Sequence, residues 1–191
     1  MRSDSVIIPC YQDEVKLMHL PKQLHQLSHH PAEIIVVDGA DNKKCREICN
    51  QYHVLWLSSK PCRGQQLLAG VALAQGDVLW FLHADARLPP DLLSVMTAAF
   101  EHDAVGVIFV FALTSCALGQ RFVLESAIVL RCRFGGVPYG DQGLFILRQA
   151  YIQVGGHALW SLYEEVPLAR SVRCMRKFLS LSEPIFVHLR H

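Results

Sequence analysis

One carboxylate, Asp85, stands directly after an apolar run and is placed to do chemistry. Residues 78–82 have the composition of a buried strand, which stops at the short polar group His83-Ala84-Asp85. Two prolines follow, and Pro90-Asp91 has the composition of a helical first turn. Open α/β sheets build ligand sites where a buried parallel strand delivers a polar side chain at its C-terminal end. Asp85 could therefore hold a divalent metal ion on a diphosphate.

The elements that must position Asp85 alternate along the first half of the chain. The apolar patterns predict strands at 5–9, 33–38, 54–57 and 77–82, and helices at 13–27, 41–52 and 63–74. Pro21 is expected to kink or split the first helix. Such an order implies a parallel sheet with right-handed crossovers. The second strand also ends in a carboxylate, Asp38.

The second half has a different pattern. It predicts strands at 105–113, 143–147 and 185–187, and helices at 117–134, 149–154 and 163–177. No repeat or linker divides the 191 residues. We therefore expect one α/β domain over 1–191, with a mostly parallel central sheet flanked by helices. Its nucleotide-binding half covers about 1–88 and its acceptor-facing half about 89–191.

Composition excludes several classes of protein. The net charge of +1 gives no nucleic-acid footprint. Seven cysteines, an odd number in no zinc pattern, indicate reduced thiols in the cytosol. A metal site at Cys45 and Cys49 lacks two further ligands. Histidines at four positions are expected on solvated surface: His19, His25, His29 and His30.

The sequence predicts neither a signal peptide nor a transmembrane segment. Pro9 ends the first apolar run far short of a signal core. The longest apolar stretch, 104–118, is too short to span a bilayer. The mixed helix expected at 117–134 packs on the sheet or lies in a lipid interface, and core packing is favoured. We expect a cytoplasmic protein, either free or peripheral at the inner face of the membrane.

Taken together, these stretches resemble a known family. The chain looks like a family 2 glycosyltransferase of the GT-A fold, within the bacterial branch that carries a Phe-Leu-His-Ala-Asp motif. The resemblance runs from Ser5 to about Val187, and the last two of its anchors are the most specific. The anchors are Ser5–Pro9, Glu33–Gly39, Arg63-Gly64, Gly76–Val78, Phe81–Asp85 and Val137–Phe145.

The resemblance implies an inverting transfer from a nucleotide-sugar donor, assisted by Mg²⁺ or Mn²⁺. Asp38 would contact the nucleoside, Arg63 the base or a phosphate, and Asp85 the metal with His83 beside it. Pro9, at the end of the first strand, belongs to the same donor site. Near the sugar or acceptor would lie a loop formed by Tyr139, Gly140, Asp141 and Gln142. Glu164-Glu165 falls where the family has a Glu-Asp pair, so Glu165 would be the general base, with Asp141 the next candidate.

Each of these residues also has a purely structural interpretation. Asp38 could cap the following helix, although Asp41 is better placed to do so. His83 could be a satisfied loop histidine, and Arg63 a surface residue of a first helical turn. Asp141 could belong to a turn. Glu165 could lie on a solvated helix face beside Glu164. Asp85 lies too far upstream to cap the helix at Pro90.

Several departures from the family pattern leave a second function open. The loop after Asp38 lacks the family's serine, Leu68 replaces an asparagine, and Gln12 stands where asparagine is usual. The base is Glu165 in place of aspartate, with Pro167 close behind. The alternative is therefore a sugar-nucleotide-binding protein with weakened catalysis that acts as a partner or regulator. Donor nucleotide, sugar and acceptor, whether lipid-linked or a small molecule, are not specified by the sequence.

Overall fold

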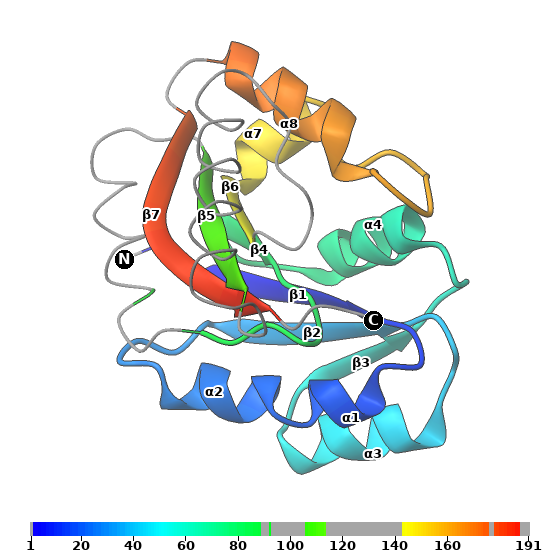
Figure 1. Ribbon diagram of the computed structural model, residues 1–191. Coiled ribbons are helices and arrows are strands. Elements are labelled where there is room, and N and C mark those ends of the chain that lie inside the picture. The colour runs from blue at the N-terminus through cyan, green and yellow to red at the C-terminus, as the bar shows by residue number, and fades with distance from the viewer. Residues whose placement is uncertain (1, 89–91, 93–105, 114–142, 176–177, 188–191) are drawn as a thin grey trace.

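A seven-stranded sheet in the order β3-β2-β1-β4-β6-β5-β7 organises the protein (Figure 1). The computed structural model describes residues 2–88, 92, 106–113, 143–175 and 178–187. The helix expected at 117–134 and the start of the one expected at Pro90 lie outside these residues. In the described part of the chain, no helix is long and apolar enough to cross a membrane.

The first half forms the parallel part of the sheet. Its four strands are β1 (Asp4–Cys10), β2 (Glu33–Asp38), β3 (Leu55–Ser58) and β4 (Val78–Phe81). β1 lies between β2 and β4, and β2 pairs with β3. Parallel strands in this arrangement point their C-terminal ends to one edge of the sheet. The predicted order of strands and helices in this half is confirmed.

The second half extends the sheet with one reversed strand. β6 (Leu144–Leu147) runs antiparallel to both β4 and β5 (Gly106–Leu113), whereas β7 (Phe178–Val187) runs parallel to β5. A mostly parallel sheet in one α/β fold was expected and is confirmed. The last strand was predicted only over 185–187, so its extent was underestimated.

Among the described residues, three helices cover one face of the sheet. They are α1 (Glu14–Leu17), α2 (Leu20–Gln26) and α3 (Lys43–Gln51). Val6 and Ile8 of β1 point into this layer together with Leu24 and Cys45. Figure 1 shows the three helices together below the sheet. Pro21 lies in the first turn of α2, where its missing N–H is harmless, so the expected split of the first helix is confirmed.

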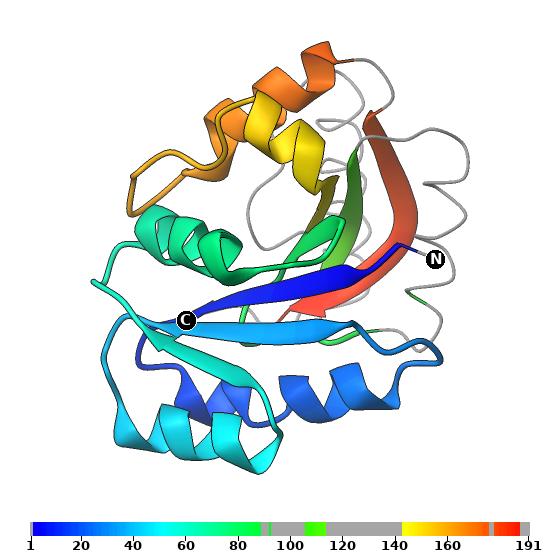
Figure 2. The ribbon, with the colours of Figure 1, turned by 180° about the vertical axis from the view of Figure 1, so that it is seen from behind.

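The opposite face carries α4 (Arg63–Leu73), α7 (Arg148–Gln153) and α8 (Glu165–Cys174). Ile7 of β1 points into this layer with Leu67, Phe81 and Leu168. Successive residues of a strand face opposite sides, so Val6, Ile7 and Ile8 serve both cores in turn. Figure 2, the view from behind, shows α4, α7 and α8 on the side of the sheet away from α1–α3.

Candidate functional site

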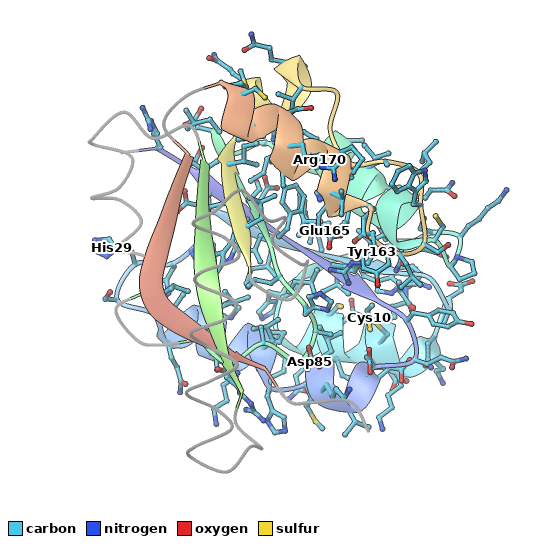
Figure 3. The ribbon with its side chains drawn as sticks, turned by 45° about the horizontal axis from the view of Figure 1, so that its top comes forward. Cys10, His29, Asp85, Tyr163, Glu165 and Arg170 are labelled. Carbon is cyan, nitrogen blue, oxygen red and sulfur yellow. The ribbon has the colours of Figure 1, made fainter. Side chains whose placement is uncertain are left out.

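The polar residues singled out by the sequence gather where the parallel strands end. Cys10 and Asp38 are register partners at the last positions of β1 and β2. Asp85 follows β4 by a few residues. Figure 3 shows Asp85, Cys10, Tyr163 and Glu165 on one side of the molecule, while His29 lies at the far side. This edge is where an open α/β sheet binds ligands.

Asp38 is fully buried and organises the loop that follows it. Its Oδ1 accepts the backbone N–H of Ala40 at 2.9 Å, and its Oδ2 accepts that of Asn42 at 2.7 Å. The N-cap of α3 is Asn42, whose side chain accepts the N–H of Lys44, so the preference for Asp41 was wrong. Asp41 has φ 50°, a conformation that Asp tolerates better than most residues. Asp38 therefore fixes a loop at the ligand-binding edge.

Asp85 has one buried oxygen that no described residue hydrogen-bonds. The residue is 7% exposed, and its Oδ2 lies 3.8 Å from Nζ of Lys16. Among the described residues nothing hydrogen-bonds to its Oδ1. An orphaned buried carboxylate oxygen calls for an explanation such as an ion, and carboxylate oxygen suits Mg²⁺ or Mn²⁺. The residue therefore fits the expected metal.

The metal would take most of its ligands from the substrate and water. No group of three or more His, Cys, Asp or Glu residues in the described part of the chain could hold a metal by itself. Mg²⁺ commonly binds through one or two carboxylates together with substrate phosphates. A single carboxylate at the expected diphosphate site would be consistent with that usage. His19, His25, His29 and His30 are exposed, as the sequence predicted.

Arg63, the first residue of α4, joins two parts of the site. Its Nε donates to Oε1 of Glu164 in an ion pair. Its Nη2 lies 2.7 Å from Nε2 of His83, and its Nη1 lies 3.3 Å from Nδ1 of that ring. The guanidinium thus ties the loop after β4 to the start of α8. Sequence analysis anticipated a ligand contact for Arg63 and missed this bridge.

Glu164 and Glu165 form a buried acidic pair at the start of α8. They are 1% and 8% exposed, so the solvated-face interpretation of Glu165 is wrong. Burial raises the pKa of Glu164, and the Glu165 carboxylate adds to that effect, while the Arg63 guanidinium opposes it. A negative charge at a helix N-terminus is favourable. Glu165 therefore sits where a carboxylate can be kept in a partly desolvated site.

The segment before α8 is seated on α4. The N–H of Gly64 donates to the carbonyl oxygen of Trp160 at 2.9 Å, and a Cβ on Gly64 would lie 1.9 Å from the carbonyl oxygen of Ala158. His157 anchors the other end, since its Nδ1 lies 2.9 Å from the hydroxyl of Tyr151. Burial lowers the pKa of His157 to about 3, and Arg63 contributes to the shift.

Gln66 is a further site residue that sequence reasoning missed. Its side-chain amide donates to the carbonyl oxygens of Cys10 and Val37, both at 2.8 Å. These carbonyl groups belong to the last residue of β1 and the next-to-last residue of β2, so Gln66 connects the two strand ends. The available signal was a polar residue one turn after Arg63, on the apolar face of an amphipathic helix. Pro9 lies buried in β1 beside this tie.

Four predicted residues lie outside the described part of the chain, namely Tyr139, Gly140, Asp141 and Gln142. Their predicted roles stay predictions. The described residues that the fold does bring to one edge are Asp38, Arg63, His83, Asp85, Glu164 and Glu165.

An α/β sheet with buried carboxylates near the C-terminal ends of its parallel strands is typical of a ligand-binding enzyme domain. The family model described as glycosyl transferase family 2 matches residues 5–158. The chain therefore belongs to glycosyl transferase family 2, a family of enzymes. Comparison with curated proteins found no significant match.

Solved glycosyltransferases share the fold. The chain is similar to TarS of S. aureus, with 13% identity, a TM-score of 0.76 and coverage of 98% of this chain and 37% of that one. It is similar to glucosyl-3-phosphoglycerate synthase from Mycobacterium tuberculosis, solved with Mn²⁺ and UDP (15%, TM-score 0.72, 100% and 73%). A mannosyltransferase from Pyrobaculum calidifontis, solved with GDP-Man and Mn²⁺, also matches (15%, TM-score 0.69, 98% and 56%). The chain spans little more than a third of TarS, and these likenesses establish the GT-A-like fold.

Proposed function

We propose that this chain transfers a sugar from a nucleotide-diphosphate donor to an acceptor hydroxyl, with inversion at the anomeric carbon. The observation that carries the proposal is the pair of buried carboxylates, Asp85 and Glu165, on the same side of one sheet edge. Membership of glycosyl transferase family 2 supports the reaction class. The first half, about 1–88, would bind the donor and the rest would face the acceptor.

The donor lies across the ends of β1, β2 and β4 in this proposal. The loop held by Asp38 receives the nucleoside, with Pro9 at its floor. Asp85, through its unpaired Oδ1, holds Mg²⁺ or Mn²⁺. When bound, the metal ion supplies Lewis-acid neutralisation of the diphosphate charge. Solved neighbours with Mn²⁺ and UDP or GDP-Man support this choice of cofactor and donor class.

The chemistry needs a group that takes one proton. In the transfer, the acceptor oxygen bonds to the anomeric carbon while the bond from that carbon to the diphosphate oxygen breaks. The acceptor proton goes to the Glu165 carboxylate, and the nucleoside diphosphate leaves. Glu164, held by Arg63, positions Glu165 at the start of α8. The loop of Tyr139, Gly140, Asp141 and Gln142 would complete the sugar and acceptor side.

The partners are thus a nucleotide-sugar donor and an acceptor that is lipid-linked or a small molecule. We infer that the protein works in the cytoplasm, free or peripheral at the inner face of the membrane. The nucleotide of the donor can be tested first, by measuring thermal shifts with a panel of nucleoside diphosphates in the presence of Mn²⁺. A ligand at about 100 times its Kd adds about 2.7 kcal/mol of stability.

Glu165→Gln tests the assignment of the base. The amide keeps the shape but cannot take the proton, so transfer or donor hydrolysis should fall about 10²- to 10⁴-fold. Nucleotide binding should stay unchanged. A variant with near wild-type turnover would rule Glu165 out and move the role to Asp141. If the wild-type protein binds the donor but neither transfers nor hydrolyses it with Mn²⁺, the chain is a sugar-nucleotide-binding regulator instead.

A further inference from the structure

A cluster of exposed apolar side chains borders the acidic pair at the start of α8. We call residues 159–163 the apolar loop. Leu159, Trp160, Leu162 and Tyr163 are 68%, 53%, 73% and 57% exposed. Four of the ten large apolar side chains that are exposed among the described residues therefore fall within five consecutive positions. Single exposed apolar residues need no explanation, but a contiguous group marks an interaction surface.

Backbone hydrogen bonds hold the apolar loop in this exposed position. The N–H of Ala158 donates to the carbonyl oxygen of Glu164 at 3.2 Å and closes the loop at its base. The carbonyl oxygen of Trp160 is bound by the N–H of Gly64 on α4. Tyr163 has φ 60°, a costly conformation for a bulky residue, which persists only where the surroundings fix it. The exposure is therefore built into the fold.

The apolar loop also lies next to the proposed base. Glu165 follows Tyr163 by two residues, and Figure 3 shows the two side chains as neighbours on the same side of the molecule. Figures 1 and 2 show the α7–α8 connection passing over the start of α4 at the outside of the molecule. An acceptor whose hydroxyl reaches Glu165 would therefore lie near this loop.

We propose that the apolar loop docks on a lipid bilayer, so that Glu165 meets an acceptor held in that bilayer. Trp and Tyr combine an apolar ring with a polar tip and favour membrane interfaces. Lys60 is exposed on the turn that leads into α4 and suits headgroup phosphates. A second copy of the chain is a poorer occupant, since a stable interface buries about 800 Å² per partner, from 20 or more residues.

Vesicle binding tests this inference with the full chain. The wild-type protein should co-sediment with phosphatidylcholine vesicles and with vesicles that also contain phosphatidylglycerol. The double variant Leu159→Ser/Leu162→Ser should lose at least about tenfold in partitioning, because two exposed leucines no longer enter the bilayer. Val15→Ser is the matched control, since Val15 is 63% exposed on the opposite helical layer and its loss should change nothing.

Three results would overturn the inference. One is the absence of vesicle binding by the wild-type protein. Another is binding only to anionic vesicles with full release by salt, which would make it purely electrostatic. The third is a self-association that the double variant abolishes while vesicles stay unbound. The docking on a bilayer does not depend on the proposed function, and only the role of the bilayer as the source of the acceptor rests on it. Nucleotide thermal shifts without vesicle binding defeat the docking alone, and vesicle binding without any nucleotide effect defeats the function alone.

Discussion

Arg63 and Glu164, which are 101 positions apart in the sequence, form an ion pair that joins the start of α4 to the start of α8. The two side chains are 22% and 1% exposed, so the pair is largely removed from water. The same guanidinium contacts His83 after β4. One side chain therefore couples the loop that leads to Asp85 with the helix that begins at Glu165.

Removing one partner of this ion pair should lower the free energy of unfolding more than replacing both partners does. Arg63→Met leaves the buried Glu164 carboxylate unpaired, and Glu164→Gln leaves the guanidinium without its counter-charge, so either change should cost about 3–5 kcal/mol. The double variant should be clearly less destabilised than the sum of the two. Urea unfolding of the four proteins measures the coupling. Effects that add within about 0.5 kcal/mol would show that the two groups do not interact energetically.

Lys16 should compete with the metal ion that we propose binds at Asp85. Its ammonium lies 3.8 Å from Oδ2 of Asp85, and its side chain is 40% exposed. Lys16→Gln removes that positive charge, so we expect affinity for Mn²⁺ in the presence of a nucleoside diphosphate to rise about two- to fivefold, a modest effect because the ammonium is partly exposed to solvent. Calorimetry measures the change, and Lys22→Gln on α2 is the control. An unchanged affinity in Lys16→Gln would argue against a metal at Asp85.

The parallel half of the fold was predictable because its sequence signals are local. Val6, Ile35 and Leu79 belong to short apolar runs that are buried on both faces, and such runs indicate parallel strands. The full extent of the last strand was not predictable, because Ser180, Ser182 and Pro184 interrupt its apolar pattern. β7 owes its length to pairing with β5, from Gly106 opposite Phe178 to Leu113 opposite Val187. That pairing is a tertiary effect.

The candidate site was predictable where a motif carried it. Asp38 is the last residue of β2 and Asp85 comes shortly after β4, so strand prediction alone placed them at one edge. The bridge from Arg63 to Glu164 and the contact of Lys16 with Asp85 span many residues of sequence, and no local pattern encodes them. Gln66 gives only a weak local signal, a polar residue on the apolar face of its helix, and the two strand-end carbonyl groups that it binds come from distant parts of the sequence.

His157 should make the protein less stable in acid. Its pKa is lowered to about 3, mainly by burial, whereas an unfolded imidazole titrates near 6.5. Between these values the unfolded chain binds the proton and the folded chain does not, so stability rises with pH from about 3 to 6.5 and is lost as pH falls through that window. The loss reaches about 1.4 kcal/mol per pH unit.

His157→Gln isolates this contribution. Glutamine keeps an acceptor for the Tyr151 hydroxyl but does not titrate. Unfolding free energies of both proteins at pH 4.5, 5.5 and 7 give the difference in slope, which cancels the carboxylates that both share. We expect a shallower acid loss in the variant. Parallel pH profiles would mean that His157 titrates normally in the folded state.

Replacing Gly64 or Gly70 of α4 with alanine should lower the free energy of unfolding by different amounts. A Cβ on Gly64 would lie 1.9 Å from the backbone carbonyl oxygen of Ala158, whereas one on Gly70 would meet the Cγ2 methyl groups of Ile7 and Val37 at 2.5 and 3.2 Å. The overlap at Gly64 is the deeper one and meets backbone that is tied by a hydrogen bond from Ala158 to Glu164, whereas the overlap at Gly70 meets buried β-branched side chains that have little room to shift. Gly64→Ala should therefore cost about 1–3 kcal/mol, and Gly70→Ala somewhat less, since the helix propensity of alanine offsets part of its overlap.

Limited proteolysis separates a local from a global effect of these glycines. Gly64→Ala should lift the apolar loop from α4 and speed cleavage by chymotrypsin after Trp160, Leu162 or Tyr163, because local opening exposes the backbone there. Gly70→Ala should leave that rate unchanged, since its neighbours lie under the middle of the helix. Equal cleavage in both variants would mean that Gly64 does not hold the loop. Faster cleavage in Gly64→Ala alone would assign the seating of the loop to the absence of a side chain at that position.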